Sequence, residues 1–205
     1  MEKFDFKKVY KDLYAAKNVP NVVEVPEMVF ISVKGKGAPA SNSYVEAIGI
    51  LYGLTYSIKM SKMNNNEPDG YFEYSVPPLE GTYRDDTIGF DLEDKNTYHW
   101  NLTIRQPEFV TEEVFKWAKE ILRKKKPELD VDKALYIKYT EGKCVQMMHH
   151  GSYDDEHKSF TLMEEFMNEN KLLRSDMHEH REIYMNDPRR TKPDKLKTIL
   201  RIKIK

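Results

Sequence analysis

Cysteine and long apolar runs are scarce in this sequence. It has one cysteine, Cys144, which excludes an internal disulfide and any zinc site built from cysteines. We interpret Cys144 as a small buried side chain in a strand, and its isolation fits a reducing compartment. No apolar stretch approaches the roughly 20 residues of a membrane-spanning helix, and no basic and apolar leader begins the chain. We therefore expect a cytoplasmic protein without a membrane partner.

An excess of charge of one sign is also absent. The chain has 33 lysines and arginines against 34 aspartates and glutamates, a formal net charge of -1. Such a balance removes the long-range attraction on which non-specific nucleic-acid binding depends. The basic run at 123–126 closes a predicted helix, where cations suit the helix dipole. We expect no direct contact with nucleic acid.

Signatures of common enzyme classes are missing as well. The sequence has no Gly-x-Ser-x-Gly elbow, no phosphate loop ending in Gly-Lys-Ser/Thr and no Gly-x-Gly-x-x-Gly turn. The six histidines form no metal pattern, since His149 and His150 would lie on opposite strand faces and no His-Glu-x-x-His occurs. We expect no metal and no cofactor.

The sequence does contain enough apolar material for one core. Of its 205 residues, 40% are hydrophobic and 12% aromatic, which predicts one compact domain over residues 1–205. Residues 1–26 have apolar residues at near-helical spacing and predict a strap that lies on this domain.

Hydrophobic periodicity then predicts two similar parts. The first, about residues 27–105, comprises a strand, a glycine turn, a helix and further strands, at 28–33, 35–37, 41–63, 71–76, 79–83 and 96–104. A connecting helix at about 111–126 leads to the second, about residues 135–205, with a strand, a helix and two strands at 143–149, 153–170, 178–184 and 198–204. The repeated order predicts a pseudo-twofold axis and a ligand cleft where the two parts meet. Exposed strand edges leave a homodimer open.

One carboxylate stands out near the C-terminus. Glu182 lies in the strand His180-Arg181-Glu182-Ile183-Tyr184, and a carboxylate on the inward face of a strand is costly to bury without a partner. That partner can be a cationic or electron-poor ligand, or it can be Arg181, Arg201 or a lysine. Alternate residues of a strand share a face, so His180, Glu182 and Tyr184 point the same way. This trio is our candidate wall for the cleft, although His180 can also be purely structural.

Aromatic residues can supply the rest of the cleft. Trp100 is the first candidate, because Tyr98 and Leu102 flank it on the inward face of a strand. Each of these rings can instead be plain core packing. Glu80 occupies a position in the first part near the one that corresponds to Glu182 and is a second acidic candidate, unless it is only a turn carboxylate. The further aromatic candidates for ligand binding are Phe72, Tyr74, Tyr83 and Tyr139.

Four segments resemble the GyrI-like small-molecule-binding family. They are Val76-Pro77-Pro78-Leu79-Glu80-Gly81, Arg105-Gln106-Pro107-Glu108-Phe109-Val110-Thr111, Gln146-Met147-Met148-His149-His150-Gly151-Ser152-Tyr153-Asp154-Asp155-Glu156, and Glu182-Ile183-Tyr184 with Asp187-Pro188-Arg189-Arg190-Thr191. The resemblance spans roughly residues 5–205 and is closest to the stand-alone branch. It implies a duplicated strand-helix-strand-strand α+β fold with an antiparallel sheet and a central cleft for hydrophobic, often cationic, molecules.

The resemblance also implies two alternative functions. Part of the stand-alone branch consists of cyclopropanoid hydrolases, which open the cyclopropane of DNA-alkylating natural products inside an aromatic cage. By motif position, Glu182 would be the acidic catalytic residue and Tyr184 its aromatic neighbour. The alternative is a non-catalytic protein that sequesters aromatic xenobiotics or modulates a partner such as DNA gyrase.

Overall fold

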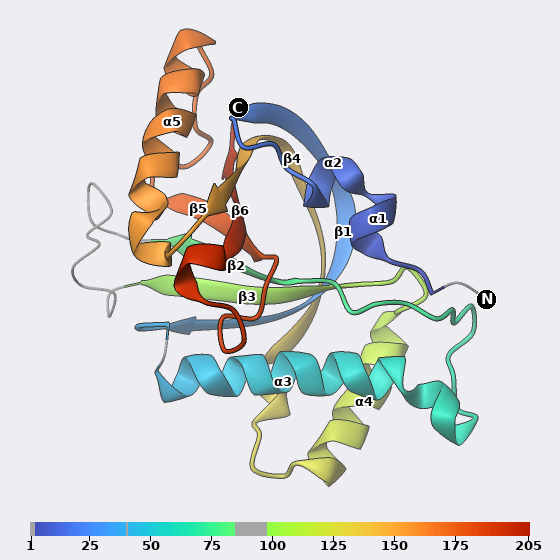
Figure 1. Cartoon of the computed structure of the whole chain (residues 1–205). Helices are drawn as coiled ribbons and strands as arrows, with labels where there is room; N and C mark the ends of the chain where they lie inside the picture. Colours follow the sequence, from blue (N-terminus) through green and yellow to red (C-terminus); the bar gives the residue numbers. More distant parts are fainter. Residues whose placement is uncertain (1–2, 40, 85–97) are drawn as a thin grey trace.

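The computed structural model describes residues 3–39, 41–84 and 98–205. Within them, six strands form a closed antiparallel sheet in the order β1-β3-β2-β5-β6-β4 (Figure 1). The strands are β1 (Asn21–Lys36), β2 (Leu79–Arg84), β3 (His99–Gln106), β4 (Ala134–His150), β5 (Glu179–Tyr184) and β6 (Lys197–Lys203). Pairing between the two long strands, β1 and β4, closes the sheet. The α+β class and the antiparallel sheet are thus as predicted.

Helices cover this sheet and its openings. They are α1 (Phe6–Val9), α2 (Lys11–Tyr14), α3 (Asn42–Lys59), α4 (Glu112–Lys125) and α5 (Glu156–Glu169). Short 3-10 turns span Ser61–Asn64, Val131–Lys133, Tyr153–Asp155 and Pro193–Lys195. No helix in the described ranges combines the length and the apolar character needed to cross a membrane.

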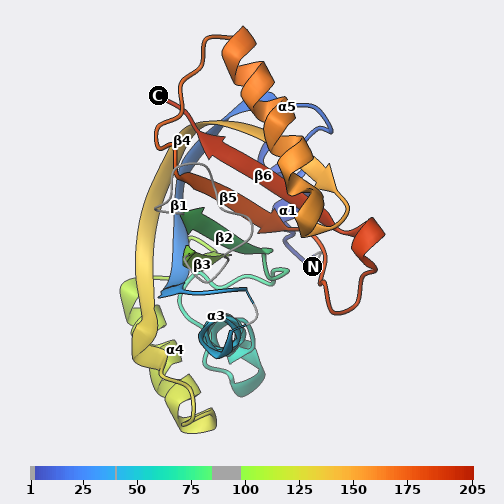
Figure 2. The same ribbon diagram turned by 90° about the vertical axis from the view of Figure 1, so that its left-hand side faces the viewer.

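Strands and helices follow the same order in both parts of the chain. The first part runs β1-α3-β2-β3 and the second β4-α5-β5-β6. In the sheet, β1-β3-β2 is followed by β5-β6-β4, so equivalent strands lie at equal distances from the β2–β5 boundary. A pseudo-twofold axis through that boundary stays a prediction. The arrangement places β2 and β5 side by side, between α3 and α5 (Figure 2).

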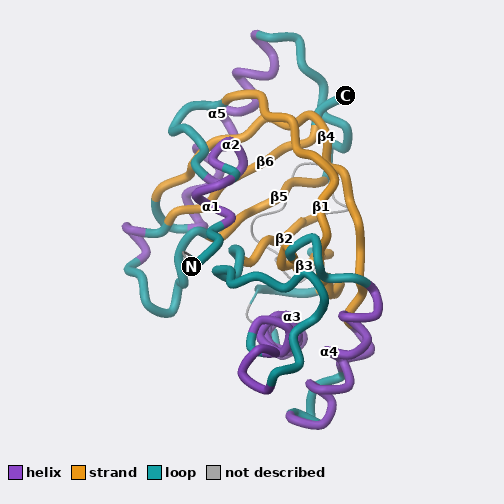
Figure 3. Tube along the Cα trace, turned by 90° about the vertical axis from the view of Figure 1, so that its right-hand side faces the viewer, coloured by secondary structure: helices purple, strands orange, loops and turns teal. Residues whose placement is uncertain are grey.

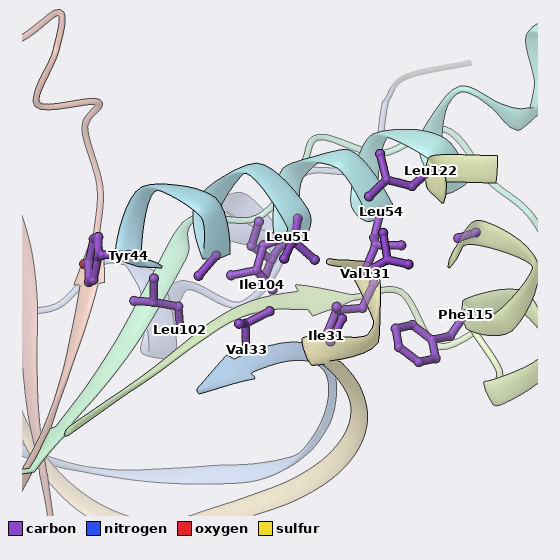
Figure 4. Close-up of a cluster of buried hydrophobic side chains, with 14 of the residues drawn as sticks. Ile31, Val33, Tyr44, Leu51, Leu54, Leu102, Ile104, Phe115, Leu122 and Val131 are labelled. Atoms are coloured by element: carbon purple, nitrogen blue, oxygen red, sulfur yellow. The ribbon is translucent and has the colours of Figure 1, made fainter. Parts of the chain in front are cut away.

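Helix α3 forms the largest core with the outer face of β1 and β3 (Figure 4). The Ser41 side chain caps the helix by accepting from the Tyr44 backbone N–H at 3.4 Å, which satisfies an orphan amide. Its buried residues follow the predicted helical spacing, and they include Ala47, Leu51, Leu54 and Ile58. Figure 4 shows Tyr44 at one end of this row, apart from the other labelled side chains.

The strap is shorter than predicted. Only α1 and α2 are helical, near the N-terminus in Figure 3, and β1 already begins at Asn21, inside the predicted 1–26 segment. Sequence reasoning ended the strap at Pro26, but a proline costs a strand only its own hydrogen bond. At Pro26 the strand runs beside β4 alone, because pairing with β3 starts at Val29.

The predicted strand at 71–76 does not form. Tyr74 alone makes an isolated bridge, to Phe4 of the strap. Here aromatic packing replaces strand pairing. The centroid of the Phe72 ring lies 5.2 Å from that of Phe4 and 5.3 Å from that of Phe109. The segment therefore secures the strap to the domain.

The inside of the closed sheet holds an ion cluster, which we define as Glu80, Glu141, Arg181 and Arg201. Arg181 contacts Glu80 at 2.9 Å and Glu141 at 3.0 Å, and Arg201 contacts Glu141 at 3.1 Å. Two cations thus lie against two carboxylates, and all four side chains are buried. Cys144 is buried nearby in β4, as predicted, and burial raises the pKa of its thiol to about 12.

Candidate functional site

A cleft of about 1580 Å³ lies between α3 and α5, above β2 and β5. Helix α3 and helix α5 form opposite walls, and the two central strands form the floor. The side chains that line it include Tyr44, Ile48 and Tyr52 of α3, Phe160 of α5, Tyr83 of β2, His180, Glu182 and Tyr184 of β5, and Tyr153 of the 3-10 turn before α5. Ligand sites of proteins are typically concave and mainly apolar with a few placed polar groups. This cleft fits that description.

Glu182 is the acidic group on the cleft floor. Its side chain is 12% exposed, and its two carboxylate oxygens have different partners. His180 Nε2 lies 2.9 Å from Oε1, and the Tyr184 hydroxyl donates to Oε2 at 2.7 Å. The three side chains share one face of β5, as the alternation of the strand predicts. A carboxylate has about four acceptor positions, so Glu182 can still accept from a water or a ligand.

No lysine or arginine in the described ranges pairs with Glu182. Arg181 and Arg201, which the sequence offers as partners, point into the closed sheet and belong to the ion cluster. A nearly buried carboxylate without a cation is costly. Glu182 thus faces the cleft, and its hydrogen-bond partners among the described residues are a histidine and a hydroxyl.

Two further tyrosine hydroxyls continue from Tyr184. Its hydroxyl lies 2.5 Å from that of Tyr83 on β2, which lies 2.5 Å from that of Tyr44 on α3. Burial, followed by the charge of Glu182, holds the pKa of Tyr83 and of Tyr184 well above the usual range, and burial raises the pKa of Tyr44. All three hydroxyls are therefore neutral at physiological pH.

A glycine leaves the space that this hydrogen-bond chain needs. Gly81 is the β2 residue opposite Glu182. A Cβ at Gly81 would lie 2.6 Å from the Tyr83 ring and 2.8 Å from its hydroxyl. Because Gly81 has no side chain, the Tyr83 ring can cross it and reach Tyr184.

Aromatic rings hold the floor residues in place. Phe160 of α5 packs edge-on against His180 with centroids 4.8 Å apart, and Tyr83 stacks on the same imidazole at 5.7 Å. Tyr153 packs edge-on against Tyr184 at 5.8 Å. Such contacts favour one rotamer for each polar group.

Four of the nine candidates from the sequence meet in the cleft: Glu182, Tyr184, His180 and Tyr83. The other five, Trp100, Glu80, Tyr74, Phe72 and Tyr139, are not among its lining residues. Trp100 is 3% exposed and lies one layer beneath the cleft, edge-on to Tyr44 with centroids 5.2 Å apart. Its ring crosses Gly35, where a Cβ would lie 2.2 Å from the indole.

The remaining four face other surroundings. Glu80 points to the opposite side of β2 from Tyr83, into the ion cluster. Tyr74 and Phe72 pack with the strap around Phe6. Tyr139 lines a separate polar cavity of about 240 Å³ beside Arg181 and Arg201. These surroundings keep all four side chains out of the cleft lining.

Sequence reasoning missed the helical contributions to the cleft. Tyr44 lies in the predicted helix at 41–63 and Phe160 in that at 153–170, but neither was among the nine candidates. Tyr153 lay within a quoted motif without a role. No periodicity within one helix distinguishes a cleft wall from a core face, because the partner surface decides between them.

In the described part of the chain, no group of three or more histidine, cysteine, aspartate or glutamate side chains is placed to hold a metal ion. The polar groups on the cleft floor are a carboxylate, an imidazole and tyrosine hydroxyls. These groups can accept, donate and transfer protons at an apolar surface.

Comparison with known proteins agrees with this geometry. Residues 19–205 match the GyrI-like small molecule binding domain. A crystal structure described as a hydrolase encoded by lin2189 from Listeria innocua is 44% identical, with a TM-score of 0.94 and complete coverage of both chains. A second L. innocua protein, described as uncharacterized and conserved, is 45% identical with a TM-score of 0.95, covering 99% of this chain and 100% of its own.

More distant structures share the fold alone. The C-terminal domain of EcmrR is 13% identical with a TM-score of 0.55, covering 91% of this chain and 96% of its own. No protein with curated annotation matches the chain. The match over most of its length, together with the duplicated fold and central cleft, shows that the chain belongs to the GyrI-like small-molecule-binding family.

Proposed function

We propose that this protein binds flat, hydrophobic aromatic or cationic xenobiotics in its cleft and hydrolyses cyclopropanoid DNA-alkylating agents, protecting the cytoplasm. The observation that carries the proposal is the Glu182 carboxylate, 12% exposed, facing an aromatic cleft with no lysine or arginine partner in the described ranges. An electron-poor ligand would provide the partner that the protein does not. The similarity to a protein described as a hydrolase supports an enzyme.

The reaction needs a general base and a binding site that holds the flat ring. Glu182 accepts a proton from water as the water oxygen bonds to the cyclopropane methylene carbon. The cyclopropane C–C bond breaks, and its electron pair enters the conjugated ring to leave a phenolate oxygen. That oxygen takes a proton, so the net change is the addition of one water. Tyr184 and His180 fix the orientation of the carboxylate, while Phe160 and Tyr153 confine the flat ring.

Turnover tests the proposal directly. Purified protein at a small fraction of the concentration of a duocarmycin-type alkylator should give many equivalents of ring-opened, water-added product, followed by mass spectrometry. Glu182→Gln should reduce the rate by about 10²–10⁴-fold, the usual contribution of general acid–base catalysis. Affinity for an analogue without the cyclopropane should stay within about threefold.

Glu179→Gln is the matched control. It changes a carboxylate on the same strand that points to the opposite face and lines the small polar cavity. It should retain turnover. Product limited to one equivalent with the wild-type protein would leave the alternative, a sequestering or gyrase-modulating binder, and would reject the hydrolase.

A further inference from the structure

The hydroxyls of Tyr44, Tyr83 and Tyr184 form a continuous hydrogen-bond chain that ends at Glu182 Oε2. The steps are 2.5, 2.5 and 2.7 Å, so each pair of oxygens is in direct contact. The chain joins three elements, α3, β2 and β5, across the boundary between the two parts of the protein. All four residues line the cleft.

Proton counting gives the chain a direction. Each tyrosine has one proton to donate, and an ionised carboxylate can only accept. With Glu182 ionised, Tyr184 donates to Glu182, Tyr83 donates to Tyr184, and Tyr44 donates to Tyr83. The Tyr44 oxygen then presents only lone pairs to the cleft. With Glu182 protonated, the same oxygens allow the reverse order, in which Tyr44 donates toward the cleft.

We propose that this chain returns the proton that Glu182 takes from water, and that Tyr44 delivers it to the phenolate oxygen of the opened ring. The inference rests on the proposed hydrolase function. One proton moves from Glu182 to Tyr184, one from Tyr184 to Tyr83, one from Tyr83 to Tyr44 and one from Tyr44 to the phenolate. Glu182 is ionised again at the end, and no proton is exchanged with solvent.

After the reaction, the hydrogen bonds of the chain have the same directions as in the resting state. After the transfers, Tyr44, Tyr83 and Tyr184 all donate toward Glu182, and the product phenol donates to the Tyr44 oxygen. Burial keeps the hydroxyls neutral, which favours concerted transfer over a tyrosinate intermediate. Tyr44 is thus the proton donor, and Tyr83 and Tyr184 are positioning residues that connect it to the base.

The first test compares Tyr44→Phe, Tyr83→Phe and the double variant. Each single change breaks the chain, so each should lower kcat by about 10- to 100-fold with little change in KM, and the double variant should lose no more than either single variant. In wild type, the solvent deuterium effect on kcat should depend non-linearly on the deuterium fraction. In Tyr83→Phe this dependence should become linear.

Tyr14→Phe is the matched control. Tyr14 is another buried tyrosine whose hydroxyl contacts a glutamate, Glu80, but it lies inside the closed sheet. Its loss should leave kcat unchanged. Turnover that is equally insensitive to Tyr44→Phe and Tyr14→Phe would overturn the relay and leave the hydrolase intact, whereas a wild-type protein without turnover would reject both.

A binding measurement tests the direction of the hydrogen-bond chain without turnover. Because the Tyr44 oxygen accepts in the resting state, wild type should bind 2-naphthol about fivefold more tightly than 2-methoxynaphthalene, the ratio expected of one hydrogen bond. Tyr44→Phe should abolish this preference, and Tyr14→Phe should keep it. An unchanged preference in Tyr44→Phe would contradict the assigned direction of the chain.

Discussion

Arg181 and Glu182 are neighbours in the sequence, yet they lie on opposite faces of β5. Arg181 contacts Glu80 and Glu141 inside the closed sheet, whereas Glu182 contacts His180 and Tyr184 at the cleft floor. The alternation of a strand produces this separation, because successive side chains point to opposite faces. One strand thus supplies both a structural cation and a chemically available carboxylate.

Removing Arg181 should strongly destabilise the protein. Arg181→Leu leaves Glu80 and Glu141 buried with one fewer cation, and breaking one side of a buried ion pair typically costs about 3–5 kcal/mol. We expect a loss of this size in the free energy of unfolding, measured in urea. Arg123→Leu on α4 removes only exposed ion pairs and should change the free energy of unfolding far less. Equal effects of the two changes would contradict a structural role for the ion cluster.

The ion cluster should also make stability depend on acidity. Burial by itself would raise the pKa of Glu141, but Arg181 and Arg201 outweigh burial and hold the pKa below its usual range. A depressed folded-state pKa stabilises the fold above the unfolded-state value, and that contribution is lost as pH falls through the folded-state pKa. Wild type should therefore lose stability as pH falls from the ordinary glutamate range downward.

The pKa shift of Glu80 has the opposite sign to that of Glu141, because burial raises the pKa of Glu80 above the usual range despite Arg181. Its contribution is full at low pH and declines as pH rises through the folded-state pKa. Comparing urea unfolding from pH 7 to the acid limit, Glu141→Gln should flatten the acid-side loss and Glu80→Gln should not. A steeper acid loss in Glu141→Gln than in wild type would show that the sign is wrong.

Trp100 should report ligand binding without contacting the ligand. It packs edge-on against Tyr44, whose hydroxyl end lines the cleft. We expect a cyclopropane-free analogue of the alkylator to change the tryptophan emission. Trp100→Phe should abolish that change and leave the dissociation constant, measured by calorimetry, within about threefold.

The second tryptophan provides the control. Trp117 lies on α4, away from the cleft lining, so Trp117→Phe should keep the emission change. If Trp100→Phe weakens binding by about tenfold or more, Trp100 contacts the ligand as the sequence predicted, and the layer beneath Tyr44 must rearrange on binding.

By itself, the sequence determined the order of most strands and helices, apart from the strand expected at 71–76, and it offered Glu182 as the first acidic candidate. Period-two alternation placed His180, Glu182 and Tyr184 on one face, and helical spacing predicted the helix that contains Tyr44. These are local properties, because side-chain direction within one element follows from backbone geometry alone. The strap boundary was predicted wrongly at Pro26, because the effect of a proline on a strand depends on which neighbouring strands pair there.

Only the tertiary structure decided which residues share the cleft. Closing the sheet turned Glu80 and Tyr139 toward the interior and placed Trp100 beneath Tyr44, and it left Glu182 without an arginine partner in the part of the chain that the structure describes. It also brought Tyr44 of α3 and Tyr184 of β5, 140 positions apart in the chain, to either side of the Tyr83 hydroxyl. Contacts of this kind depend on which faces the sheet and helices turn toward each other, and periodicity within one element carries no information about its partner.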